Sequence, residues 1–184
     1  MLKYSPEIEG KRIVLRKLKL SHANDMYQNI RNKAIARWTT IPQPYPADGA
    51  VKHIRQQQRL WRERKSFAFA VILKETGKLI GGIGLIRVDF KHQCAELGYW
   101  LAKRYWNRGL MTEAIPLILQ FGFKELKLYR IYAMKYQANV ASARVLEKCG
   151  FTREGCMRKA IILRNQRQDL LNYAILKTEF KVFK

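Results

Sequence analysis

The sequence is poor in acidic residues, in cysteine and in long apolar runs. Its 14 Asp and Glu stand against 36 Lys and Arg, so the net charge of +22 attracts phosphates, nucleic acids, anionic membranes or acidic proteins. The three cysteines form no CxxC pair, which argues against a disulfide framework and fits a reducing compartment. The longest apolar run, at 67–73, is far below the ~20 residues that a membrane helix needs.

Other signals are absent as well. The N-terminus lacks the apolar stretch of a secretory signal, so we expect a cytoplasmic protein without a membrane association. The three histidines have no ligand-like spacing to each other or to a cysteine, and no metal site is expected. No linker, repeat or low-complexity tract divides the 184 residues, so they predict a single domain over 1–184.

The apolar periodicity predicts a mixed fold. Strands are expected at 11–18, 67–73, 79–88, 93–101, 130–136, 151–163 and 168–177, and helices at 21–32, 48–64, 109–126 and 139–149. The order predicts an α/β (α+β) domain with a mixed, mostly antiparallel sheet of about seven strands flanked by helices. Pro116 lies inside one expected helix and should remove one of its backbone hydrogen bonds.

The segment YWLAKRYWNRGLMTEA, at 99–114, has the chemistry of an anion site. A strand leads through a basic loop into a helix that begins near Gly109, and the N–H groups of a first helical turn favour negative charge. Lys103, Arg104 and Arg108 add positive charge. The alternative is an ordinary basic loop that binds nothing.

Two further features are candidates for chemistry. Asn139 and Ser142 open the next helix, where Asn139 is expected to cap the helix and Ser142 to reach back toward it. Glu96 is a carboxylate in the middle of an apolar strand, and burial would raise its pKa and make it a better base. The alternatives are a simple helix cap and an ion pair of Glu96 with a cation on a neighbouring strand.

Together, the segments AELGYWL, WNRGLMTEA and NVASARVLEKCGF resemble the GNAT superfamily of N-acetyltransferases. Within it, the chain resembles the ribosomal-protein N-acetyltransferase branch (RimJ/RimL type), over about 11–177. The resemblance implies acetyl-coenzyme A as the acetyl donor and a primary amine as the acceptor. It also implies a sheet that splays between the strands at 93–101 and 130–136, where the pantetheine arm of the cofactor lies.

The resemblance implies a role for each site residue. Asn139 would hold the pantetheine arm, Ser142 would protonate the departing thiolate, and Glu96 would be the base. The residues expected around the cofactor, mostly through the backbone of the loop, are Leu101, Arg104, Trp106, Asn107, Arg108, Gly109, Leu110, Met111 and Thr112. Leu146 replaces a tyrosine that many relatives use as the acid, and Ile161 replaces a second carboxylate that some use as the base.

The expected acceptor is a protein N-terminal α-amine, on a ribosomal or otherwise acidic protein, because a charge of +22 repels polycations. A small-molecule amine such as an antibiotic or a polyamine is the alternative acceptor, and a non-catalytic RNA- or ribosome-binding module is the alternative function. Trp38, Tyr45 and Trp61 either line an acceptor groove or belong to the core. Monomer and homodimer both stay open.

Overall fold

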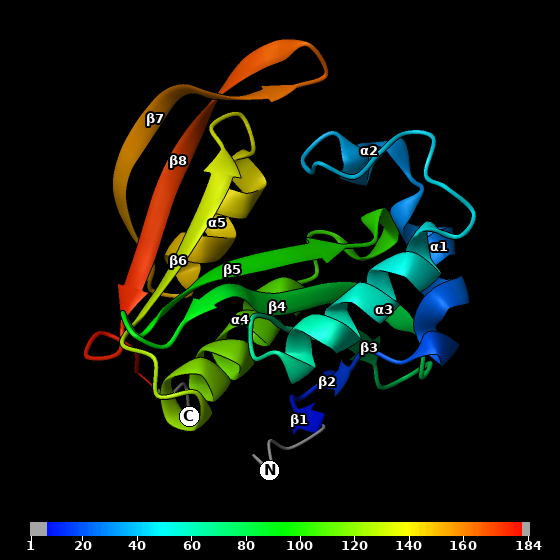
Figure 1. The fold of residues 1–184 in the computed structure, drawn as a ribbon, viewed down its shortest axis with the longest axis horizontal. Coiled ribbons are helices and arrows are strands. Elements are labelled where there is room, and N and C mark those ends of the chain that lie inside the picture. Colours follow the sequence, from blue (N-terminus) through cyan, green and yellow to red (C-terminus); the bar gives the residue numbers. More distant parts are fainter. Residues whose placement is uncertain (1–6, 182–184) are drawn as a thin grey trace.

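The computed structural model describes residues 7–181, and residues 1–6 and 182–184 of the predicted domain lie outside the described part (Figure 1). The strands are β1 (Glu7–Glu9), β2 (Ile13–Lys17), β3 (Phe67–Leu73), β4 (Leu79–Asp89), β5 (Cys94–Leu101), β6 (Arg130–Tyr136), β7 (Thr152–Leu163) and β8 (Gln166–Leu176). The α-helices are α1 (Ala23–Ile30), α2 (Lys33–Ala36), α3 (Gly49–Arg62), α4 (Leu110–Gln120) and α5 (Val140–Lys148).

All eight described strands form one sheet in the order β1-β2-β3-β4-β5-β6-β8-β7. Neighbouring strands are antiparallel, except for the parallel pair β5 and β6. This parallel pairing extends only from Cys94–Arg130 to Glu96–Tyr132, although β5 continues to Leu101. The two strands therefore separate (green and yellow in Figure 1), which confirms the predicted splay and leaves a V-shaped opening in the sheet.

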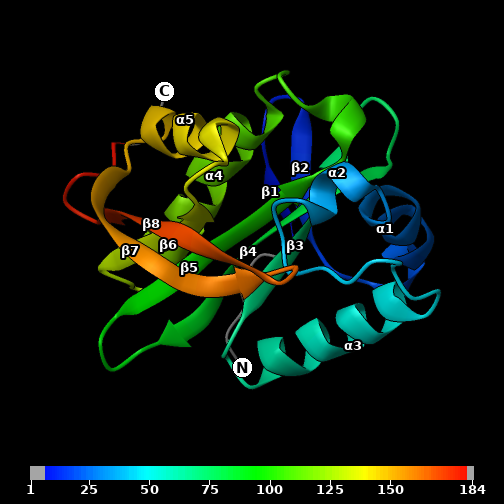
Figure 2. The same cartoon turned by 90° about the horizontal axis from the view of Figure 1, so that it is seen from above.

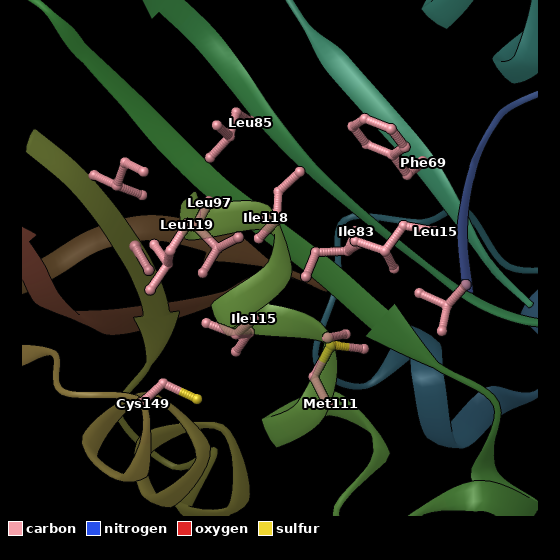
Figure 3. Close-up of a cluster of buried hydrophobic side chains, with 14 of the residues drawn as sticks. Leu15, Phe69, Ile83, Leu85, Leu97, Met111, Ile115, Ile118, Leu119 and Cys149 are labelled. Carbon is pink, nitrogen blue, oxygen red and sulfur yellow. The ribbon is translucent and has the colours of Figure 1, made fainter. Parts of the chain in front are cut away.

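Helices cover both faces of the sheet (Figure 2). One face packs against α4, whose Ile115, Ile118 and Leu119 are fully buried among strand residues (Figure 3). The other face packs against α1 and α3 through a second cluster that includes Met26 and Ile54. Apolar residues that alternate along each strand supply both clusters, because successive side chains of a strand point to opposite faces.

The structure adds short elements that the sequence pattern does not predict. β1 is an eighth strand of three residues, and α2 is a helix of four residues, both too short for a recognisable periodicity. The helix expected at 109–126 is α-helical only to Gln120 and continues as a π-helical segment at Phe121–Glu125. The other predicted strands and helices are confirmed, with ends that differ by a few residues.

Pro116 lies inside α4 as predicted. Without an N–H, it cannot donate to the carbonyl of Thr112, four residues earlier. The Sγ of Cys149, the residue that follows α5, donates to that carbonyl oxygen at 3.7 Å. The hydrogen bond lost at the proline is thus replaced by a contact between the two helices that begin beside the opening.

No helix within residues 7–181 is long and apolar enough to cross a membrane. The same residues hold no group of His, Cys, Asp and Glu side chains that could bind a metal ion.

Candidate active site

Two helix N-termini lie at the edge of the sheet where β5 and β6 separate. Both strands run in the same direction, so their carboxyl ends lie on the same side of the sheet, apart from each other. β5 leads through residues 102–109 into α4, and β6 leads through residues 137–139 into α5. The sulfur contact between Cys149 and Thr112 keeps α4 and α5 adjacent. Each first helical turn thus follows a strand that borders the opening, and the N–H groups of such a turn favour an anion.

The start of α4 presents bare backbone. Gly109, the N-cap residue, has a φ of 72° and offers no side-chain cap. A Cβ there would meet only an atom of Arg12 at 3.6 Å, so the left-handed backbone and not a lack of space favours glycine. The first intrahelical bond runs from the N–H of Glu113 to the Gly109 carbonyl, which leaves the N–H groups of 110–112 outside the helical ladder.

Several side chains of this segment serve the interior of the protein. Leu110 and Met111 are buried in the core, and Figure 3 shows Met111 below the sheet. The indole N–H of Trp106 donates to the Leu101 carbonyl at 2.7 Å, so this tryptophan stabilises the loop from within. Asn107 has a φ of 59° and turns the chain before Gly109. In the turn that leads into α4, the side chains at 106, 110 and 111 thus stabilise the loop and the core.

Positive charge surrounds the start of α4. Lys103, Arg104 and Arg108 are exposed. The guanidinium groups of Arg104 and Arg108 lie 4.9 and 5.7 Å from the ring centroid of Tyr105, which holds both beside the loop. The sequence prediction of a basic rim around this turn agrees with the structure.

Arg12 and Glu113 form a brace that holds the loop before α4, and no local sequence pattern predicts it. Arg12 donates to the carbonyl of Arg108 at 2.9 Å, and its Nε lies 2.8 Å from Oε2 of Glu113. Oε1 of Glu113 accepts from the backbone N–H groups of Arg12 and Ile13. Burial opposes ionisation of Glu113, but these hydrogen bonds together hold its pKa below the ordinary value. The scarcity of acidic residues is the only sequence signal that could have drawn attention to Glu113.

At the start of α5, side chains form hydrogen bonds that the start of α4 lacks. Asn139 caps the helix as predicted, because its Oδ1 accepts from the N–H of Ser142 at 3.1 Å. Ser142 does not reach back in return. Its Oγ lies 2.7 Å from the hydroxyl of Tyr99, which comes from β5 on the other side of the opening. Burial raises the pKa of Tyr99 and keeps its phenol protonated.

Glu96 lies at the last parallel pair, opposite Tyr132, where the two strands begin to separate. Its neighbours Ala95 and Leu97 are buried in the α4 cluster, so the Glu96 side chain is on the opposite face of the sheet. Oε2 of Glu96 accepts from Arg87 of β4 at 2.7 Å, which is the ion pair foreseen as the alternative. Burial raises the pKa of Glu96, and Arg87 opposes this rise.

A cavity of about 560 Å³ lies beside α1 and the loop that follows α2. Its lining residues are Tyr27, Arg31, Lys33, Gln43, Pro44 and Tyr45. Tyr27 and Tyr45 pack against the same cluster as Trp100, which shares its face of β5 with Glu96. Within residues 7–181, neither Arg31 nor Lys33 forms an ion pair. The cavity is therefore aromatic and positively charged.

The sequence allows Trp38, Tyr45 and Trp61 either to line an acceptor groove or to belong to the core. Trp61 packs edge-on against Phe67 and Phe69 and so belongs to the core. Trp38 is half-buried, with Arg37 4.8 Å from its ring centroid. Tyr45 alone of the three lines the cavity.

Comparison with known proteins identifies related sequences. The family model of the acetyltransferase (GNAT) domain matches residues 12–152. In Bacillus subtilis, the uncharacterized N-acetyltransferase YoaA is 29% identical over 94% of this chain and 97% of its own, and the probable N-acetyltransferase YjcK is 32% identical over 92% and 96%. Spermidine N(1)-acetyltransferase of Escherichia coli is 24% identical over 91% of this chain and 88% of its own.

Solved structures share the fold. A GNAT-family acetyltransferase from Bacillus anthracis has a TM-score of 0.83 and 28% identity and covers 94% of this chain and 99% of its own. The ribosomal-protein-S5-alanine acetyltransferase of Vibrio fischeri has a TM-score of 0.84, 25% identity and coverage of 95% and 98%. RimL, a ribosomal L7/L12 α-N-protein acetyltransferase in complex with coenzyme A, resembles the chain in fold alone, with a TM-score of 0.87, 22% identity and coverage of 92% and 97%.

Proposed function

Since the chain belongs to the GNAT family of acetyltransferases, we propose that it transfers the acetyl group of acetyl-coenzyme A to the α-amine of a protein N-terminus. Acetyl transfer follows from membership of the family. The acceptor and the role of each residue are inferred from the site. The observation that carries the acceptor class is the aromatic, positively charged cavity on the same side of the sheet as Glu96.

The start of α4 fits the pyrophosphate of acetyl-coenzyme A. The N–H groups of 110–112 lie outside the helical ladder, Gly109 adds no side chain, and Arg104 and Arg108 supply charge. Donors of this kind match a group with several negative charges. At the start of α5, Oδ1 of Asn139 serves the helix cap, which leaves its Nδ2 to donate to an amide carbonyl of the pantetheine arm.

Acetyl transfer forms a C–N bond and breaks a C–S bond; the amine must lose a proton and the sulfur must receive one. Glu96 accepts the amine proton, directly or through a water, because burial raises its pKa at the point where the strands separate. Ser142 donates its proton toward the sulfur. The hydroxyl of Tyr99, 2.7 Å from the Oγ of Ser142, is within reach to exchange a proton with it.

The role of Glu96 competes with its ion pair to Arg87, and the pH profile separates the two. If Glu96 is the base, turnover falls as the pH drops through its pKa, which is raised above the ordinary 4.5. This fall is the acid limb of the pH profile. Glu96→Gln should lower kcat and remove the acid limb. Arg87→Met should move the acid limb to higher pH, because Arg87 opposes the rise in pKa. An unchanged kcat in Glu96→Gln would leave the carboxylate as a structural ion-pair partner.

The cavity favours an acceptor with an acidic residue near its N-terminus. Glu96 and Trp100 lie four residues apart on one face of β5, a span of ~13 Å at ~3.3 Å per residue. Trp100 packs against the same core cluster as the tyrosines that line the cavity, where Arg31 and Lys33 would meet a carboxylate. An extended acceptor with its amine at Glu96 therefore reaches the cavity at about its fourth or fifth residue.

A small amine is the second candidate, since the spermidine acetyltransferase of Escherichia coli matches most of the chain. Two observations weigh against a polyamine. The net charge of +22 repels polycations at long range, and the cavity adds Arg31 and Lys33 at short range.

Thiol release with a panel of acceptors distinguishes the candidates. Two peptides that begin with alanine and differ only in Glu or Gln at positions four and five are compared with spermidine, and mass spectrometry locates the acetyl group. We expect acetylation of the α-amine of both peptides, with the higher kcat/KM for the acidic one and a loss of that preference at high salt. A kcat/KM higher for spermidine than for either peptide would overturn the protein acceptor. Binding of RNA without acetylation of any amine would favour the non-catalytic module.

A further inference from the structure

Lys135 of β6 occupies a position where the strand pattern calls for an apolar residue. Ile131 and Ala133 precede it on the same face, and both are buried in the cluster under α4. The side chain of Lys135 is only 6% exposed. Within residues 7–181, Lys135 and Ser66 are the only buried residues that are polar or charged.

The ammonium group of Lys135 binds the turn between β6 and α5. Its Nζ donates to the carbonyl oxygen of Tyr136 at 3.2 Å and to that of Asn139 at 3.0 Å. These carbonyls are at the two ends of the turn. The ring centroid of Tyr173 lies 5.9 Å from Nζ, and the hydroxyl of Tyr173 donates to Glu147. Among the described residues, no carboxylate lies within ion-pair distance of Nζ.

Stability gives little reason for a lysine here. Burial lowers the pKa of Lys135, and Arg153 lowers it further against an opposing effect of Glu147. A buried cation without a carboxylate partner is costly, and the positive end of the α5 dipole adds to this cost. An unbranched apolar side chain of similar volume would fit the pattern of the strand and avoid both penalties.

We propose that Lys135 is a positioning residue that holds the β6–α5 turn in the geometry needed for acetyl transfer. The inference rests on the proposed roles of Asn139 and Ser142. The carbonyl that Lys135 binds belongs to Asn139, whose side chain caps the N–H of Ser142, and Ser142 in turn contacts Tyr99. Lys135 thus holds the backbone of Asn139 in place. The proposed contacts of Asn139 with the pantetheine arm and of Ser142 with the sulfur both depend on that position.

The charge of Lys135 has a second effect at the same place. The sulfur that leaves the acetyl group develops negative charge beside Ser142, and a buried cation near that point stabilises the charge more than it would in water. The hydrogen bonds hold the turn, and the positive charge favours the departing thiolate. Variants that separate the donor from the charge can therefore distinguish the two contributions.

The test compares Lys135→Met, which keeps the volume and loses the donor, with Lys135→Gln, which keeps a donor and loses the charge. We expect Lys135→Met to melt at or above the temperature of the native protein while its kcat/KM for acetyl-coenzyme A falls about 10–100-fold. The kcat/KM of Lys135→Gln should lie between the values of the native protein and of Lys135→Met. Lys148→Met, which removes an exposed lysine of α5, is the matched control and should leave the kinetics unchanged.

A merely structural lysine would lower stability without this kinetic loss, so the opposite directions of melting temperature and kcat/KM are diagnostic. Native kcat/KM in folded Lys135→Met overturns the inference. If Lys135→Met does not fold, the decision passes to Lys135→Gln, where native kinetics overturn it equally. Asn139→Ala and Ser142→Ala distinguish the two levels: full activity in both refutes the proposed site, whereas losses there beside a normal Lys135→Met refute only the role of Lys135.

Discussion

The N-termini of α4 and α5 lie at the same edge of the sheet and are built in opposite ways. α4 follows the N-cap Gly109, with no side-chain cap and with cations near N–H groups that lie outside the helical ladder. α5 begins at Asn139, whose side chain, like the hydroxyl of Ser142 and the ammonium of Lys135, already has a hydrogen-bond partner. A helix start without a side-chain cap suits a group with several negative charges, such as a pyrophosphate. A helix start held by side-chain hydrogen bonds suits the placement of a single atom, such as the departing sulfur. We therefore expect changes at α4 to act mainly on KM and changes at α5 mainly on kcat.

The largest effect is expected at the start of α5. Ser142→Ala removes the proposed proton donor and should lower kcat about 100-fold with little change in the KM for acetyl-coenzyme A. Tyr99→Phe, which removes only the partner of the Ser142 hydroxyl, should lower kcat less. Steady-state kinetics measure kcat and KM for both variants, with Ser21→Ala as the control for a serine outside the site. If kcat is unchanged in Ser142→Ala, Ser142 is a plain helix residue and the comparison fails.

The second effect concerns the backbone at the start of α4. Gly109→Ala places an L-residue at a φ of 72°, which costs about 1–2 kcal/mol and shifts the N–H groups of the first turn. The KM for acetyl-coenzyme A should rise about tenfold while kcat changes little. Gly77→Ala is a matched control, because Gly77 has a φ of 65° and nothing within 4 Å of an added Cβ. Equal effects of the two variants on KM would refute the phosphate site.

The third effect concerns the brace of Arg12 and Glu113. Glu113→Gln weakens hydrogen bonds to a charged acceptor and should lower the free energy of unfolding by about 1–2 kcal/mol at neutral pH. The folded pKa of Glu113 is lowered, so its stabilisation is complete above the ordinary value of 4.5 and is lost as the pH falls through the folded pKa. Melting curves of the variant and the native protein should therefore converge in acid. Parallel curves down to low pH would show that ionisation of Glu113 does not stabilise the fold.

The smallest effect concerns the contact between the two helices. Cys149→Ala leaves the Thr112 carbonyl without its sulfur donor and should cost about 1 kcal/mol of stability with little effect on kcat. Pro116→Ala restores the missing N–H and should recover much of this loss in the double variant. Burial raises the pKa of the Cys149 thiol to about 12, so it stays a protonated donor at neutral pH. Additive effects of the two substitutions would show that the thiol does not replace the lost bond.

Local patterns predicted most of the fold and part of the site. Apolar alternation located the strands around Phe67, and the glycine with its neighbouring cations located the start of α4. The same approach missed β1 and α2, which are shorter than one period of any pattern. It also treated Lys135 as an ordinary strand residue, although a lysine after Ile131 and Ala133 on a buried face was a readable signal.

Local sequence patterns suffice to assign most strands and helices, the start of α4 and the strongly positive net charge. These properties depend on residues a few positions apart. Only the tertiary structure joined Arg12 to Glu113, 101 residues away, and Tyr99 to Ser142, 43 residues away. The second contact spans an opening that a parallel pairing leaves by ending at Glu96. No local pattern encodes where two distant strands stop pairing, because that point is decided by how the whole core packs.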